Sequence, residues 1–190
     1  FCERYIGDRE PYDLAREMIK DLTEGMGETK LLAGLIKIST SKNEVLPVED
    51  KVIKAAIIAQ RETGAPVSTH TEAGTMALDQ IEYLVKGGIP PEQITIGHVD
   101  RLLDIDYLSK IANTGVYLGF DQISKEKYYP DAVRISVIQQ LIDSGHGKQI
   151  LLSGDLARMS YWPAFGFGNG PGLTYILWRF VPWMLEARIA

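Results

Sequence analysis

Apolar runs that can form buried strands alternate along this chain with segments that have the spacing of amphipathic helices. The runs cover residues 31–39, 66–70, 94–98, 116–119 and 150–153, and the helical segments that follow them cover 48–63, 74–87, 104–113, 131–144 and 173–187. A helix is also predicted from Pro11 to residues 25–27, because its apolar side chains recur on one face. This alternation predicts an α/β fold with a parallel sheet.

The arrangement of glycines and polar residues favours a barrel over an open sheet. No glycine-rich phosphate-binding turn follows any of the predicted strands, although an open doubly wound sheet usually has one. A complete (β/α)8 barrel needs about 250 residues, and five strands are predicted here. We therefore expect residues 1–190 to be the C-terminal part of a single TIM-barrel domain of a metal-dependent hydrolase, with roughly the last five βα units and about three units preceding them.

Four residues that can take part in metal chemistry stand at the ends of apolar runs: Lys37, His70, His98 and Asp155. The ends of parallel strands meet at one face of a barrel, so these side chains are expected to lie close together. Imidazole and carboxylate groups are ordinary ligands of Zn²⁺, and they accept Co²⁺, Mn²⁺ and Fe²⁺ in similar geometry. Lysine fits this set only as a neutral and modified nitrogen, for instance a carbamate formed with CO₂.

A carbamate on Lys37 is a carboxylate on a long arm, which is suited to bridging two divalent ions. Two ions can share a hydroxide and polarise the group that it attacks. Asp155 is the expected catalytic residue, since it would bind one ion and accept the proton of the attacking water. The pattern therefore predicts a hydrolase with two divalent metal ions, most simply zinc.

The residues around these positions resemble the phosphotriesterase family of the amidohydrolase superfamily over nearly the whole chain. The resemblance lies in Gly34-Leu-Ile-Lys37, Thr69-His70-Thr71, Ile96-Gly-His98 and Ser153-Gly-Asp155. It implies that Lys37 is the carbamylated bridging ligand, that His70 and His98 bind the more exposed metal, and that Asp155 binds the more buried one. The family also uses a His-x-His pair, which this sequence lacks, and we expect that pair in a preceding segment.

The resemblance further implies a homodimer and either lactone opening or hydrolysis of organophosphate triesters. Substrate contacts are expected from Arg101 and from Lys127 and Tyr128 in the loop 120–129, whose charges and hydroxyl suit a sugar lactone or its phosphate. The aromatic loop 158–167 suits an apolar acyl chain instead. We favour the sugar-type lactone.

Composition limits the classes of partner that this chain is expected to bind. The net charge is −5 with both signs interspersed, so the basic stripe that nucleic-acid binding needs is missing. The single cysteine is compatible with a cytoplasmic setting. The most apolar stretch, 173–185, is short and interrupted by Arg179 and Pro182, which argues against a membrane span. Two other classes stay open: a non-catalytic barrel that keeps the ligand residues, and a subunit completed by a second chain that carries the His-x-His pair.

Overall fold

Five parallel strands form one sheet in which each strand pairs with its neighbour in the sequence. The computed structural model describes residues 2–165, 168 and 170–189. The sheet order is β1-β2-β3-β4-β5, and the strands are β1 (Ile36–Thr40), β2 (Val67–Thr71), β3 (Ile94–Gly97), β4 (Tyr117–Phe120) and β5 (Ile150–Leu152). Pairing in chain order, without a reversal, is the arrangement of a TIM barrel, so the predicted α/β class is confirmed.

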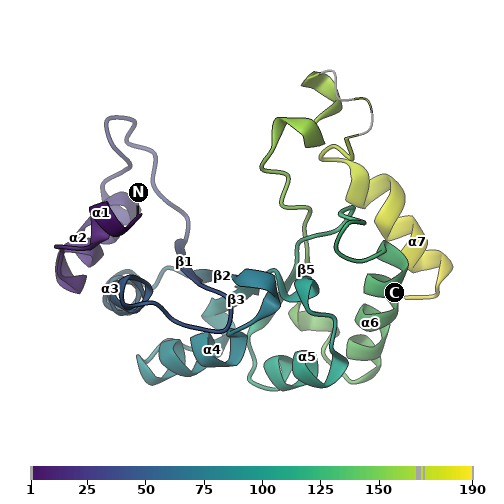
Figure 1. Cartoon of the computed structure of the whole chain (residues 1–190), viewed down its shortest axis with the longest axis horizontal. Helices are drawn as coiled ribbons and strands as arrows, with labels where there is room; N and C mark the ends of the chain where they lie inside the picture. Colours follow the sequence, from purple (N-terminus) through teal and green to yellow (C-terminus); the bar gives the residue numbers. More distant parts are fainter. Residues whose placement is uncertain (1, 166–167, 169, 190) are drawn as a thin grey trace.

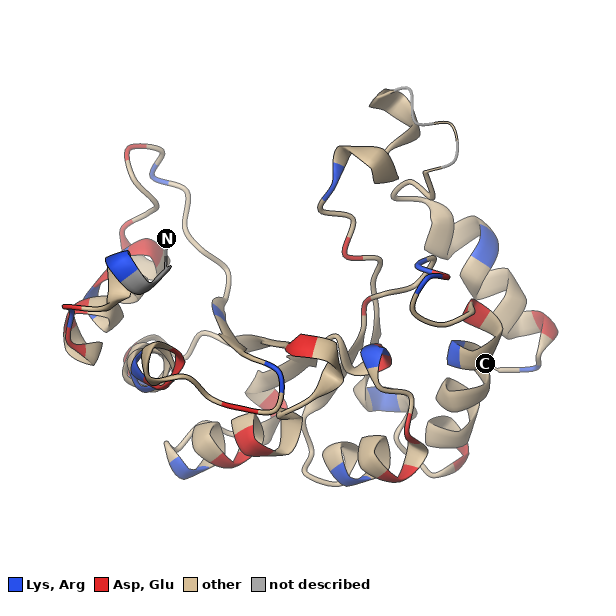
Figure 2. Cartoon of the chain, in the orientation of Figure 1, with Lys and Arg blue, Asp and Glu red and all other residues tan. Residues whose placement is uncertain are grey.

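A helix follows each strand, and α3 to α6 run along the outside of the curved sheet (Figure 1). The helices are α1 (Cys2–Ile6), α2 (Pro11–Thr23), α3 (Pro47–Thr63), α4 (Ala77–Lys86), α5 (Ile105–Ala112), α6 (Asp131–Asp143) and α7 (Val181–Glu186). Lys and Arg are interspersed with Asp and Glu over α2 to α6 (Figure 2). The described residues contain no helix that is long and apolar enough to cross a membrane.

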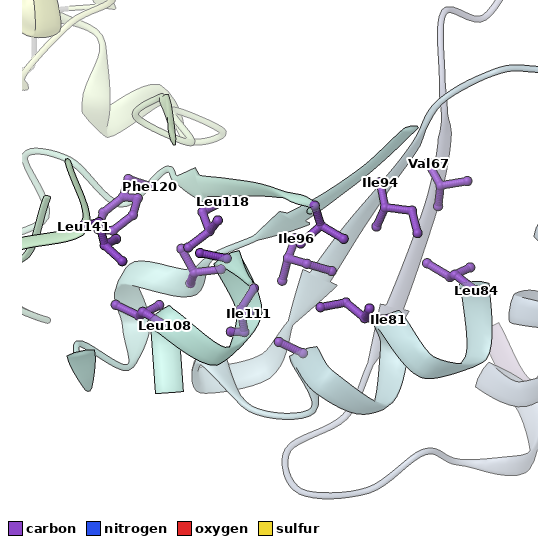
Figure 3. Close-up of a cluster of buried hydrophobic side chains, with 14 of the residues drawn as sticks. Val67, Ile81, Leu84, Ile94, Ile96, Leu108, Ile111, Leu118, Phe120 and Leu141 are labelled. Atoms are coloured by element: carbon purple, nitrogen blue, oxygen red, sulfur yellow. The ribbon is translucent and has the colours of Figure 1, made fainter. Parts of the chain in front are cut away.

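The core lies between the sheet and its helices. Ile96 of β3 and Leu118 of β4 are completely buried, as are Leu84 of α4 and Leu108 of α5, and Figure 3 shows these side chains packed in one layer. Burying one such side chain contributes about 1.5 to 3 kcal/mol. Packing of these side chains holds the strands against their helices, and with them the polar residues that follow the strands.

The first strand is shorter than the predicted run 31–39 and is buried on one face only. β1 begins at Ile36, which pairs with Val67 at the start of β2, so residues 31–35 have no strand beside them in the described structure. Leu31 instead accepts a hydrogen bond from the Met26 backbone and is 66% exposed. Within β1, buried and exposed residues alternate. The prediction took the apolar run for a buried strand, but Leu31, Leu32 and Leu35 are exposed in the described structure, because no neighbouring strand pairs with this segment.

The predicted helix 173–187 also differs from the one that the structure contains. It opens with a single π-helical turn, Ile176–Phe180, and continues as α7. In this turn the Val181 N–H bonds to the carbonyl of Ile176, five residues back. Pro182 follows and has no N–H to donate, so an ordinary helical ladder cannot continue through this position.

Candidate active site

The predicted metal-binding residues converge on the inner side of the sheet, at the carboxyl-terminal ends of its strands. His70 is in β2, His98 directly follows β3, and Asp155 lies three residues beyond β5. Lys37 differs from the prediction, because it is the second residue of β1 and does not lie at its end. Its long side chain reaches towards the edge, and Nζ donates to the carbonyl of Thr69 at 2.6 Å.

The two histidines face each other. Their ring centroids are 4.4 Å apart and the rings meet edge to face at 84°. The Nε2 atom of His70 lies 3.3 Å from a carboxylate oxygen of Glu72. His98 is the less accessible of the pair, with its side chain 13% exposed. Two imidazoles brought together in this way are a common basis for a metal site.

Asp121, which the sequence analysis did not single out, holds His98 in place. It follows the last residue of β4, and its Oδ1 atom lies 2.5 Å from Nδ1 of His98. Its Oδ2 atom accepts the backbone N–H of the same histidine at 2.9 Å. A carboxylate on Nδ1 leaves Nε2 as the nitrogen available to a ligand, which is the usual arrangement behind metal-binding histidines. The sequence did contain a signal for Asp121, because this residue directly follows an apolar strand, as His98 does.

Asp155 is held by two neighbours from the loop after β4. Lys125 donates from Nζ to its Oδ2 atom at 2.6 Å and to its carbonyl at 2.8 Å, and Gln122 donates to Oδ2 at 3.1 Å. Burial raises the pKa of Asp155, but these hydrogen bonds outweigh burial and hold it below its ordinary value. The side chain of Lys125 is only 4% exposed. Asp155 is therefore kept ionised and oriented. We name Lys37, His70, His98, Asp121 and Asp155 the strand-end cluster.

Lys37 has the surroundings that the proposed modification needs. Burial lowers the pKa of its amine, against the opposing attraction of Asp121 and Asp155. Space beside the amine is kept open by Gly97, since a Cβ there would lie 3.6 Å from Nζ of Lys37 and 3.3 Å from Oδ2 of Asp121. The described residues contain no ready-made group of three His, Cys, Asp or Glu ligands. The lowered pKa favours the neutral form of the Lys37 amine, and the space beside it is open.

The three predicted substrate contacts also come together. The guanidinium of Arg101 lies 3.8 Å from the ring centre of Tyr128, and Nζ of Lys127 lies 4.7 Å from it. A hydrogen bond from Lys127 lowers the pKa of the Tyr128 hydroxyl. We name these three residues the cationic cluster. Part of the aromatic loop 158–167, namely residues 166–167, lies outside the described residues.

Comparison with known proteins places the whole chain in one family. The model described as "Phosphotriesterase family" matches residues 1–190. The phosphotriesterase homology protein of Escherichia coli is 37% identical over 98% of this chain and 63% of its own length. Its crystal structure, with phosphate in the active site, superposes with a TM-score of 0.94, covering 98% of this chain and 64% of the solved chain at 36% identity.

Two lactonases are similar as well. The phospho-furanose lactonase of Mycoplasmopsis synoviae is 33% identical over 94% of this chain and 54% of its own. A lactonase from Listeria monocytogenes has a TM-score of 0.93 and 42% identity, over 96% of this chain and 55% of the solved one. The chain therefore spans between about half and two thirds of the length of these relatives.

Proposed function

Because this chain belongs to the phosphotriesterase family, we propose that the protein carrying it is a metal-dependent hydrolase that opens lactones. The observation that carries the proposal is the strand-end cluster, in which two neighbouring imidazoles lie close to a carboxylate held by Lys125 and to Lys37, whose amine has a lowered pKa. The lactonases among its relatives support the same reaction class.

In this proposal the metal ligands are Lys37 as a carbamate, His70, His98 and Asp155. Two divalent ions are proposed, zinc first, since Co²⁺, Mn²⁺ and Fe²⁺ accept the same donors. When bound, such ions polarise the lactone carbonyl and acidify water. The ligand roles and the carbamate are inferred from the donor set and from the open space beside Lys37.

Asp155 is proposed as the residue that accepts the proton of the attacking water. Its lowered pKa keeps the carboxylate ionised at neutral pH, as a proton acceptor must be. Lys125 and Gln122 fix the direction of the carboxylate. Asp121 in turn orients His98 through Nδ1. The chain thus supplies a positioned base after β5 and a positioned ligand after β3.

The proposed substrate is a sugar lactone that carries a phosphate. The cationic cluster offers two positive side chains and a hydroxyl, which suit a phosphate dianion. The name of the Mycoplasmopsis relative and the phosphate bound by the Escherichia coli protein support this choice. Arg101→Ala is expected to raise KM for a phosphorylated lactone about tenfold or more and to leave KM for the unphosphorylated lactone unchanged. Lys110→Ala, an exposed lysine on α5, is the control.

The experiment that tests the function compares the complete protein with its Lys37→Ala variant. Bound metal and lactone hydrolysis are measured before and after chelation. Two metals per chain, with activity lost on either treatment, are expected. A metal-free protein with no hydrolysis would favour the non-catalytic barrel, and activity on aryl phosphotriesters alone would favour the organophosphate hydrolase. The homodimer stays a prediction, which sedimentation of the complete protein would check.

A further inference from the structure

Three charged side chains are buried together behind the strand-end cluster. Arg134 of α6, Asp100 after β3 and Asp131 at the start of α6 are all 0% exposed. Burying charges is expensive, and replacing a buried ion network by apolar residues is often neutral for stability or even stabilising. The stability of the packing between α6 and the sheet therefore does not explain why three charged side chains are buried here. Their hydrogen bonds indicate another role.

One side of the guanidinium leads to His98. Nε of Arg134 donates to Oδ2 of Asp100 at 2.8 Å. Asp100 accepts the backbone N–H of Gln122 at 2.9 Å, also at Oδ2, and that of Asp121 at 3.3 Å at Oδ1. These bonds fix the backbone from which the carboxylate of Asp121 reaches Nδ1 of His98. The orientation of the imidazole thus depends on Asp100.

The other side of the guanidinium leads to Asp155. Nη1 of Arg134 donates to Oδ1 of Asp131 at 2.9 Å, and Asp131 accepts the backbone N–H of Ser124. Nη2 contacts the carbonyl of Lys125 at 3.5 Å. Both bonds hold the loop from which Nζ of Lys125 reaches the carboxylate of Asp155. The same arginine therefore supports two neighbouring parts of the site.

We propose that Arg134 is a positioning residue for the hydrolase, which orients His98 through Asp100 and Asp155 through the loop 124–131. The inference rests on the proposed function. An arginine is required because its planar fork donates in two directions at once, whereas a lysine offers one nitrogen. Arg134→Lys keeps the positive charge between the two aspartates and removes the fork, so it separates geometry from charge.

The test compares three variants of the complete protein: Arg134→Lys, Asp100→Asn and Ile138→Ala. Ile138 is a fully buried core residue of α6 outside the network, so its variant reproduces a loss of stability alone. Arg134→Lys and Asp100→Asn are expected to lower kcat roughly 10- to 100-fold, the usual effect of losing support behind a ligand, with KM changed by less than about threefold. Ile138→Ala is expected to lower the unfolding temperature and keep kcat.

A second readout does not depend on activity. In the metal-free protein labelled with ¹⁵N-histidine, the imidazole of His98 is expected to carry its proton on Nδ1, facing Asp121. Arg134→Lys should disturb this signal, and Ile138→Ala should leave it unchanged. An undisturbed His98 signal together with an unchanged kcat would overturn the positioning role. If Arg134→Lys does not fold, the kcat and the His98 signal of Asp100→Asn test the positioning role in its place. A wild-type protein without hydrolysis would refute the function, while the His98 signal would still test the positioning.

Discussion

Gly97 provides a direct test of the space beside Lys37. It lies in β3, and a Cβ at this position would be 2.4 Å from the backbone oxygen of Thr69 in β2. Ordinary van der Waals contact begins at 3.4 Å, so Gly97→Ala must move two paired strands apart by about 1 Å. Overpacking of this kind costs about 1 to 3 kcal/mol. The same methyl group would occupy the space between the Lys37 amine and Asp121.

Gly34 offers a matched control, because a Cβ there meets nothing within 4 Å. Thermal unfolding followed by circular dichroism should show Gly97→Ala melting about 2 to 12 °C below wild type, since a chain of this size loses about 2 to 4 °C for each kcal/mol. Metal content should also fall in Gly97→Ala and stay unchanged in Gly34→Ala. If the two variants melt within about 1 °C of each other and bind the same amount of metal, the reasoning about this space is wrong.

Three further predictions follow from the contacts of the site. Lys125→Met removes a hydrogen bond that lowers the pKa of Asp155. The acid limb of the pH–rate profile should therefore move to higher pH in this variant. A limb that does not move would contradict the role given to Asp155. Gln80→Leu removes the buried amide that donates to the carbonyl of His70 and should cost about 1 to 3 kcal/mol in urea unfolding; a cost below about 0.5 kcal/mol would contradict it. Reloading of chelated protein with metal at a fixed concentration of dissolved CO₂ should become faster as pH rises, because CO₂ reacts only with the neutral amine of Lys37, whose pKa is lowered by burial. Loading rates that are independent of pH would argue against the carbamate.

The βα pattern and the convergence of His70, His98 and Asp155 could be predicted because both follow from periodicity along the chain. A strand that ends in a polar residue places it at the edge of a parallel sheet, whatever the details of packing. The start of β1 could not be predicted in this way. Its first residue, Ile36, is set by where β2 begins, which is a property of a different part of the chain.

The residues that support the site were missed for a similar reason. Asp100 acts on the backbone N–H groups of Asp121 and Gln122, and backbone donors leave no mark in a sequence. Arg134 is a charged residue on a helix, where solvent exposure is the ordinary expectation. Its complete burial depends on two aspartates from separate segments. Periodicity can thus identify residues at strand ends, whereas only tertiary structure identifies what holds them.

Backbone conformation adds an argument that these strand ends serve chemistry and not packing alone. His98 has φ of 61° and Asp155 has φ of 43°, in the left-handed region that side-chain-bearing residues avoid. Each position costs about 1 to 2 kcal/mol relative to an ordinary conformation. Glycine would relieve this cost, and a glycine directly precedes each of the two. Six other residues with side chains also have positive φ in the described structure, Ala73 and Met76 among them. The strain is therefore informative at His98 and Asp155 because these two side chains are also held by hydrogen bonds, with Asp121 and with Lys125 respectively.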